Sequence, residues 1–279
     1  MSSSVEQLGS HHAEALRALL LKEPVQHLYL LGLLEEFGLQ PRPGPAGCAF
    51  WGRFEAGALG SVLFVGGEGA LLVPGSQDAA SAAAFAQALG PRLRVGGLLG
   101  ERPAVDALVR ALCPRTPRLS RLQRLFSVSA DDLGPFTNPT LRLARDEDLA
   151  RLLPLAVGAV REGLERDPLD EGAELFEARV RQRVRARRTY VLEEAGELVF
   201  KVDVGSRSQH GAELEGLYTL PAQRRRGHAT LCLGQISRHL LSSLPRLSLR
   251  VDEQDASLAG IARKVGFVPG RPQRLVLME

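Results

Sequence analysis

A chain of 279 residues is long enough for two ordinary domains or one large one. Its 44% hydrophobic and 24% charged residues exclude a disordered or fibrous chain, and a net charge of +3 gives no overall field that would demand a nucleic acid as partner. Cys48, Cys113 and Cys232 stand far apart without a Cys-x-x-Cys pair, which predicts reduced thiols in the cytoplasm rather than a zinc knuckle or a disulfide framework. Residues 1–10 lack the features of a signal peptide, and no apolar run approaches the ~18–20 residues that span a bilayer.

The first half of the chain alternates helix and strand patterns. After a serine-rich start that is expected to fray, a loop rich in proline and glycine at residues 38–47 separates two helical patterns from a group of strand patterns. Helices are predicted at residues 11–21, 25–37, 78–89 and 103–112, and strands at 49–55, 58–65, 69–73, 93–98 and 119–128. Asp78 stands at the start of its helix, where an aspartate caps free N–H groups. This order predicts an α+β domain with a core of its own.

Three features of this half resemble functional sites without their full pattern. His11 and His12 lack further ligands at metal spacing, so we expect surface residues at a helix start and no metal site. The glycines at residues 66–69 join two strands rather than a strand to a helix, which predicts a hairpin instead of a nucleotide loop. Gly100-Glu101-Arg102 precedes a helix, but its glutamate would oppose an anion, so a plain helix cap is favoured.

The second half follows the best candidate for a linker, residues 131–138, where a glycine and a proline precede Phe136 and Pro139 follows. We therefore place the domains at residues 1–136 and 137–279. Strands are predicted at residues 141–144, 189–194, 198–204 and 247–251, and helices at 146–166, 170–186 and from 257 onward. The second of these helices ends in arginines that spread around it: Arg179, Arg181, Arg183, Arg185, Arg187 and Arg188. A solvated basic helix end is the leading interpretation, ahead of an acidic substrate or a CoA phosphate and then nucleic acid.

The most informative stretch runs from Ala212 to Ser243. Alternating residues predict a strand that Pro221 ends, because proline lacks the N–H that a strand ladder needs. A turn, Arg224-Arg225-Arg226-Gly227-His228-Ala229, then opens directly into a helix. The first N–H groups of a helix have no partner within it, and the helix dipole adds positive charge there. Such a turn predicts a pyrophosphate site; the alternative is a solvated basic turn that caps an ordinary helix.

This passage resembles the GNAT superfamily of acyl-CoA N-acyltransferases. In that family a Thr-x-Pro-like step ends a strand, the next loop reads Gln/Arg-x-x-Gly-x-Gly/Ala, and a Gly-Phe closes the motif region. The matching residues are Thr219-Leu220-Pro221, Arg224, Gly227 and Ala229, and Gly266-Phe267. The resemblance covers about residues 141–278 and implies a mixed, mostly antiparallel sheet flanked by helices. The first half lacks such a loop and resembles the degenerate partner domains of tandem GNAT proteins.

The resemblance also implies acetyl-CoA as cosubstrate, an amine as acceptor and no metal. Glu213 and Glu215 share one face of the central strand and are the candidates for general base; the alternative is that they face solvent or pair with the arginines at 179–188. Tyr218 is a candidate proton donor to the CoA thiolate, with packing as the alternative. The residues expected to bind CoA are Leu217, Tyr218, Thr219, Arg224, Arg225, Arg226, Gly227, His228, Ala229, Asp252 and Asp255.

One departure from the family pattern bears on activity. Many members carry a tyrosine ahead of the closing Gly-Phe that protonates the thiolate, and this position is Ala262 here. The sequence predicts an acetyl-CoA-dependent N-acetyltransferase that acts on a small or peptidic amine by direct attack in a ternary complex. A noncatalytic acyl-CoA sensor and a protein-interaction module are the alternatives. No nucleic-acid or membrane partner is predicted, and the amine and the oligomeric state stay open.

Overall fold

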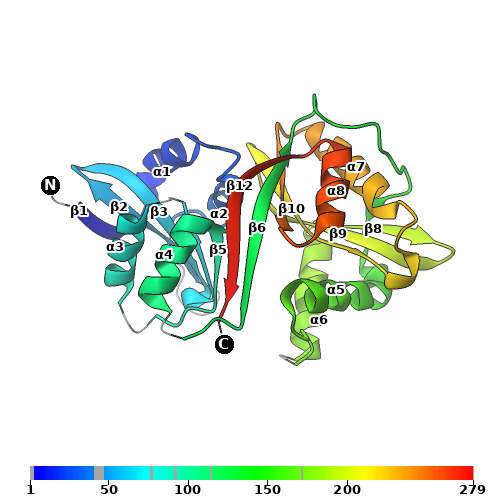
Figure 1. Ribbon diagram of the computed structural model, residues 1–279, viewed down its shortest axis with the longest axis horizontal. Helices are drawn as coiled ribbons and strands as arrows, with labels where there is room; N and C mark the ends of the chain where they lie inside the picture. The colour runs from blue at the N-terminus through cyan, green and yellow to red at the C-terminus, as the bar shows by residue number, and fades with distance from the viewer. Residues whose placement is uncertain are drawn as a thin grey trace. The chain divides into compact units, whose positions relative to one another are not determined.

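The structure is a computed structural model that describes residues 3–40, 47–75, 78–90, 93–113, 115–170 and 172–278. It divides into two compact units (Figure 1). The first unit comprises residues 1–125, 251–254 and 270–279, and the second comprises 126–250 and 255–269. The division falls within strand β6 (Leu119–Val128), ahead of residue 136, where the sequence placed the boundary. The predicted α+β class is confirmed, since helices flank a mixed sheet in each unit.

The first unit has a sheet with the strand order β1-β2-β3-β4-β5-β12. Its strands are β1 (Ser3–Gln7), β2 (Cys48–Glu55), β3 (Ala58–Gly66), β4 (Leu71–Pro74), β5 (Gly97–Glu101) and β12 (Val268–Leu277), and its helices are α1 (Ala13–Leu20), α2 (Leu28–Phe37), α3 (Ala79–Leu89) and α4 (Arg102–Leu112). Side chains of β3 alternate between two cores. Val62 and Phe64 pack with leucines of α1 and α2, whereas Leu63 and Val65 pack with residues of α3 and α4. Helices therefore cover both faces of this sheet.

Three strands of the first unit differ from the sequence prediction. β1, expected to fray, pairs antiparallel with β2 from Ser3–Glu55 to Gln7–Trp51. β12, which was not predicted, pairs antiparallel with β5 (Figure 1). Its prolines and arginines give it little strand propensity, so partner pairing rather than local pattern makes it a strand. β5 was predicted at residues 93–98, and this was wrong by several residues, because it begins only at Gly97 and reaches Glu101.

The second unit has a sheet with the strand order β11-β10-β9-β8-β7. Its strands are β7 (Arg142–Leu143), β8 (Thr189–Glu194), β9 (Glu197–Ser208), β10 (Gly211–Thr219) and β11 (Leu247–Asp252), and its helices are α5 (Leu149–Leu164), α6 (Ala173–Arg185), α7 (His228–Leu241) and α8 (Ala256–Val265). Leu152 and Val184 of α5 and α6 pack against Val191, Leu198 and Tyr218 of the sheet. Fully buried Leu233 and Ile236 mark the inward side of α7. These elements match the order predicted for residues 141–265.

The segment at residues 131–138, expected to be a linker, packs within the second unit. The Gly134 N–H donates to the Val265 carbonyl over 2.8 Å, and Arg238 donates to the Gly134 carbonyl over 2.9 Å. A Cβ on Gly234 would lie 2.2 Å from the Phe136 carbonyl oxygen. Glycine at that position thus lets the segment lie directly on α7.

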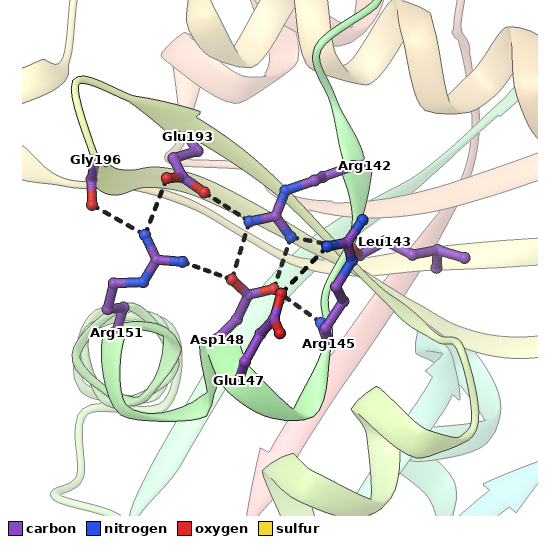
Figure 2. A network of polar contacts seen from close by, with 8 residues as sticks. All are labelled: Arg142, Leu143, Arg145, Glu147, Asp148, Arg151, Glu193 and Gly196. Atoms are coloured by element: carbon purple, nitrogen blue, oxygen red, sulfur yellow. Dashed lines mark hydrogen bonds and ion pairs between the residues drawn. The ribbon is translucent and has the colours of Figure 1, made fainter.

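The start of α5 is fixed by a polar network around Asp148 (Figure 2). The carboxylate of Asp148 is fully buried and accepts from both terminal nitrogens of Arg142, at 2.6 and 2.9 Å. It also accepts from Arg151 at 2.8 Å and from the Arg145 N–H at 2.8 Å. Glu193 of β8 accepts from both Arg142 and Arg151. The network joins β7, β8 and α5, and the Arg142 hydrogen bonds hold the pKa of Asp148 down at about 2.

Candidate functional site

The central strand of the second unit, β10, is paired differently on its two sides. It pairs antiparallel with β9 from Gly211 to Thr219. It pairs parallel with β11 at Ala212–Leu247, Glu213–Ser248 and Leu214–Leu249, and that register ends there although both strands continue. The β9 register skips Gly216 and Leu217, and Gly216 has a φ of 58°, so a bulge lies in this half of β10. Beyond Leu214 the β11 side of β10 is therefore the edge at which an extended ligand could add as a strand.

The turn after β10 leads into helix α7, whose N-terminus has no side-chain cap. Gly227 is the N-cap of α7 with a φ of 86°, and no side chain caps the helix there. A Cβ on Gly227 would meet no atom within 4 Å. Arg225, with a φ of 68°, and Arg226 are exposed beside it. Ala229 lies in the first turn of α7, so the N–H groups that begin this helix and the two arginines lie where the sequence predicts an anion site.

Arg224, expected to contact phosphate, is engaged elsewhere. Its Nε donates to the Thr219 carbonyl over 3.1 Å, and one terminal nitrogen donates to both carboxylate oxygens of Glu162, at 2.7 and 2.8 Å. Its guanidinium lies 5.4 Å from the centre of the Tyr218 ring. Arg224 therefore ties the end of β10 to α5, and the charge left for a phosphate comes from Arg225 and Arg226.

Tyr218 and His228 are both largely buried. The Tyr218 ring packs so closely on Gly158 of α5 that a Cβ there would lie 2.4 Å from the hydroxyl. Burial raises the pKa of Tyr218 and Glu162 raises it further, which makes the phenol a weaker acid. His228 places Nδ1 3.4 Å from Glu194, while its Nε2 is buried and has no hydrogen-bond partner within the described part of the chain.

The two candidate bases lie on one face of β10 with different partners. Glu213 is buried, forms an ion pair with Arg250 and accepts from the Ser248 hydroxyl at 3.3 Å. Burial raises the pKa of Glu213, and the charge of Glu215 adds to this against the opposing effect of Arg250. Glu215 is one-third exposed, and its Oε1 lies 2.6 Å from Nη1 of Arg183 on α6. Glu215 therefore pairs with an arginine of that helix, which was the alternative to a role as base.

A lysine that the sequence prediction missed lies beside this face. Lys201 of β9 is 4% exposed at its side chain and donates to Asp203 over 2.6 Å and to the Gly216 carbonyl over 2.9 Å. Asp203 also accepts from the Thr189 hydroxyl at 2.7 Å. A signal was present, because lysine occurs at only three positions in a chain with 35 basic residues, and this one alternates with buried apolar residues of a strand.

The remaining expected residues have structural contacts. Asp252, which belongs to the first unit, accepts from Arg121 at 2.7 Å, and Asp255 caps α8 by accepting from the Leu258 N–H at 2.8 Å. Ala262 is fully buried in α8. Leu217 and Thr219 are partly buried on the half of β10 that lies beyond its register with β11. In the described ranges, no group of three or more His, Cys, Asp or Glu side chains could hold a metal ion, and no helix is long and apolar enough to cross a membrane.

Comparison with known proteins locates this arrangement among solved structures. No family model and no curated protein matches the chain. A Drosophila protein solved by structural genomics is similar over 99% of both chains, with a TM-score of 0.69 and 15% identity. A GCN5-related N-acetyltransferase from Sphaerobacter thermophilus is similar over 98% of this chain and 94% of its own, with a TM-score of 0.60 and 14% identity. A tandem GNAT protein from the clavulanic acid biosynthesis pathway is similar over 99% of this chain and 98% of its own, with a TM-score of 0.55 and 14% identity.

The chain has the GNAT fold. The similarity extends over nearly the whole length and includes a tandem protein, so the predicted two-domain GNAT arrangement is confirmed as a fold. Of the residues that carry the sequence resemblance, Thr219 ends β10, Gly227 and Ala229 lie at the start of α7, and Gly266 follows the end of α8.

Proposed function

We propose that the chain is an acetyl-CoA-dependent N-acyltransferase whose cosubstrate binds to the second unit. The observation that carries this proposal is the uncapped start of α7 directly after a strand whose second half is unpaired on one side. The pyrophosphate would accept from the free N–H groups at residues 227–229, with Arg225 and Arg226 adding charge. The amides of pantetheine would pair with the backbone of Leu217, Tyr218 and Thr219.

In the proposed reaction an acceptor amine attacks the thioester carbonyl directly. The C–N bond forms, the C–S bond breaks, and CoA leaves as the thiolate. The amine proton passes to Glu213 or Glu215, directly or through water, and the raised pKa of Glu213 suits a base that works near neutral pH. With Ala262 at the usual tyrosine position and Tyr218 packed against α5, water is the proposed proton source for the thiolate.

A noncatalytic acyl-CoA sensor is the second candidate, and the buried Ala262 favours it. The CoA-binding residues proposed are the same in both cases. The enzyme and the sensor differ only in whether an amine attacks the bound thioester. We propose a cytoplasmic location in either case, which agrees with three free cysteines.

Two measurements on the full chain test the proposal. Calorimetry with acetyl-CoA should show binding, and a thiol-release assay over a panel of small amines and peptides should show turnover with at least one acceptor. Binding without turnover across a broad panel would favour the sensor. Absence of binding would overturn both candidates and leave the interaction module.

A further inference from the structure

We infer that Lys201 is a positioning residue that strengthens the backbone donor beneath the thioester, an inference that rests on the proposed function. Its ammonium group lies in the interior of the second unit and is held between the Asp203 carboxylate at 2.6 Å and the Gly216 carbonyl at 2.9 Å. A lysine suits this task, because it is a compact charge with three donors on a flexible stem. An arginine, which supplies nearly all other positive charge here, is planar and bulkier.

The acceptor of this hydrogen bond lies at the bulge of β10. The register with β9 passes from Glu215 directly to Tyr218, so the Gly216–Leu217 peptide stands outside the ladder. Gly216 adopts a φ of 58°, where glycine is strongly favoured, and a Cβ there would lie 2.9 Å from the Lys201 Nζ. The bulge and the lysine therefore fit one another, since a side chain at residue 216 would occupy the place of the ammonium.

The Leu217 N–H belongs to the same peptide group as the Gly216 carbonyl. In a trans peptide the C=O and the following N–H point in opposite directions, and the described chain contains no cis peptide bond. The Leu217 N–H therefore points away from Lys201. Leu217 is also the first of the three residues whose backbone is proposed to pair with pantetheine, the arm of acetyl-CoA that carries the thioester.

A charge on one end of a peptide affects the other end. An ammonium that donates to the carbonyl polarises the peptide, and the N–H becomes a stronger donor because hydrogen bonds in a chain reinforce one another. In a buried site this effect is larger than in water. When the amine attacks, negative charge develops on the thioester oxygen, and a donor aimed at that oxygen stabilises it. Lys201 would act on this charge through the Gly216–Leu217 peptide without touching the substrate.

Asp203 and its neighbours hold the lysine in place. Asp203 accepts from Lys201, from the Thr189 hydroxyl at 2.7 Å, and lies 3.4 Å from Arg183. Loss of Lys201 alone would leave a buried carboxylate short of a partner. The test therefore removes both charges together in Lys201→Met/Asp203→Asn, and uses Asp203→Asn as the matched control that keeps the ammonium at Gly216.

The experiment uses acetyl-CoA labelled with ¹³C at the thioester carbonyl, bound to the full chain. Infrared spectroscopy reads the carbonyl stretch, calorimetry the affinity, and the thiol-release assay kcat and KM. We expect the bound carbonyl of the unaltered chain to absorb below free acetyl-CoA, and the double variant to lose most of this shift. We also expect kcat to fall roughly 10- to 100-fold with little change in affinity, whereas Asp203→Asn keeps the shift.

A carbonyl band and a kcat that do not differ between the double variant and its control would overturn the inference and leave the proposed function intact. Absence of acetyl-CoA binding to the unaltered chain would overturn both. If the double variant does not fold, Lys201→Gln replaces it, because an amide still donates but carries no charge. Its kcat is then expected to fall about tenfold at unchanged acetyl-CoA affinity, and a value equal to that of the unaltered chain would contradict the role of the charge.

Discussion

Each unit contains a strand followed by a helix and a second strand parallel to the first, and the two versions differ where the helix begins. In the first unit β4 leads through α3 to β5, with Leu72 paired to Leu98. In the second unit β10 leads through α7 to β11, with three residue pairs in parallel register. At the start of α3 the Asp78 carboxylate accepts from the Ser81 N–H and from the Ser81 hydroxyl, both at 2.6 Å. At the start of α7 stands Gly227, without any side-chain cap.

This difference teaches where an anion can bind. A carboxylate at the N-terminus of a helix accepts hydrogen bonds from the free N–H groups and places a negative charge at the positive end of the helix dipole. A bound phosphate would do the same. Asp78 therefore occupies the anion position of α3 with the protein's own charge. Gly227 leaves that position of α7 without a side-chain cap, and we propose that a phosphate takes it beside Arg225 and Arg226. The same order of strand, helix and strand thus gives a helix capped by its own aspartate in the first unit, α3, and a helix without a side-chain cap in the second unit, α7.

The largest expected effect comes from placing an aspartate, the residue type that caps α3, at the start of α7. In Gly227→Asp the new carboxylate would compete with the pyrophosphate for the same N–H groups, and acetyl-CoA affinity should fall at least about 100-fold. Titration calorimetry measures this directly. Gly227→Asn is the matched control: asparagine also tolerates a positive φ and can cap the same N–H groups, but it adds no negative charge, so affinity should fall clearly less than in Gly227→Asp. Equal affinities of the two variants would contradict the assignment of this turn.

The next largest effect concerns Glu213 and Glu215 of β10, since β4, the corresponding strand of the first unit, carries no carboxylate between Leu71 and Pro74. Glu213→Gln should lower kcat roughly 10²-fold or more, Glu215→Gln should be milder, and acetyl-CoA affinity should change little. Since burial raises the pKa of Glu213, kcat should decline as the pH falls through that raised value and the base becomes protonated. Normal turnover of both variants from about pH 6 to 9 would assign the base to water.

Asp148 and Asp78 both stand at the start of a helix, but they should differ in what they contribute to stability. Asp148 is fully buried and bound by two arginines, so Asp148→Asn should destabilise the chain by about 2–3 kcal/mol in denaturant titration. Its folded pKa of about 2 lies below the ordinary 3.8, so its contribution is complete above pH 4–5 and is lost as the pH falls toward 2. The difference between variant and unaltered chain should therefore shrink across that window. A difference in the free energy of unfolding that stays constant with pH would contradict the assignment of this stabilisation to the Asp148 carboxylate.

Asp78 is half exposed, and its substitution is the smallest effect expected. Asp78→Ala should destabilise by about 1 kcal/mol, which is typical for loss of an N-cap. Asp78→Asn should cost less, because asparagine caps helices as well as aspartate does. Neither variant should change acetyl-CoA affinity, and a change in affinity would contradict the claim that α3 takes no part in binding.

Local patterns predicted the elements of the second unit well, because a strand, a glycine turn and an amphipathic helix each carry their signal within a few residues. β12 was missed because its strand conformation comes from pairing with β5, which lies far away in the sequence. The partners of the site residues could not be predicted either, because they too lie far away in the sequence. Nothing in the neighbourhood of Glu213 indicates Arg250, and nothing near Arg224 indicates Glu162. Lys201 was detectable only as a rare residue within an apolar strand.

Amide hydrogen exchange with and without acetyl-CoA tests the central comparison most directly, since it reads both helix starts in one sample of the full chain. We expect exchange to slow at residues 225–231, where the free N–H groups of α7 would bind the pyrophosphate, and to stay unchanged at residues 79–83 of α3. Slowed exchange at α3, or bound acetyl-CoA that leaves the start of α7 unprotected, would contradict it.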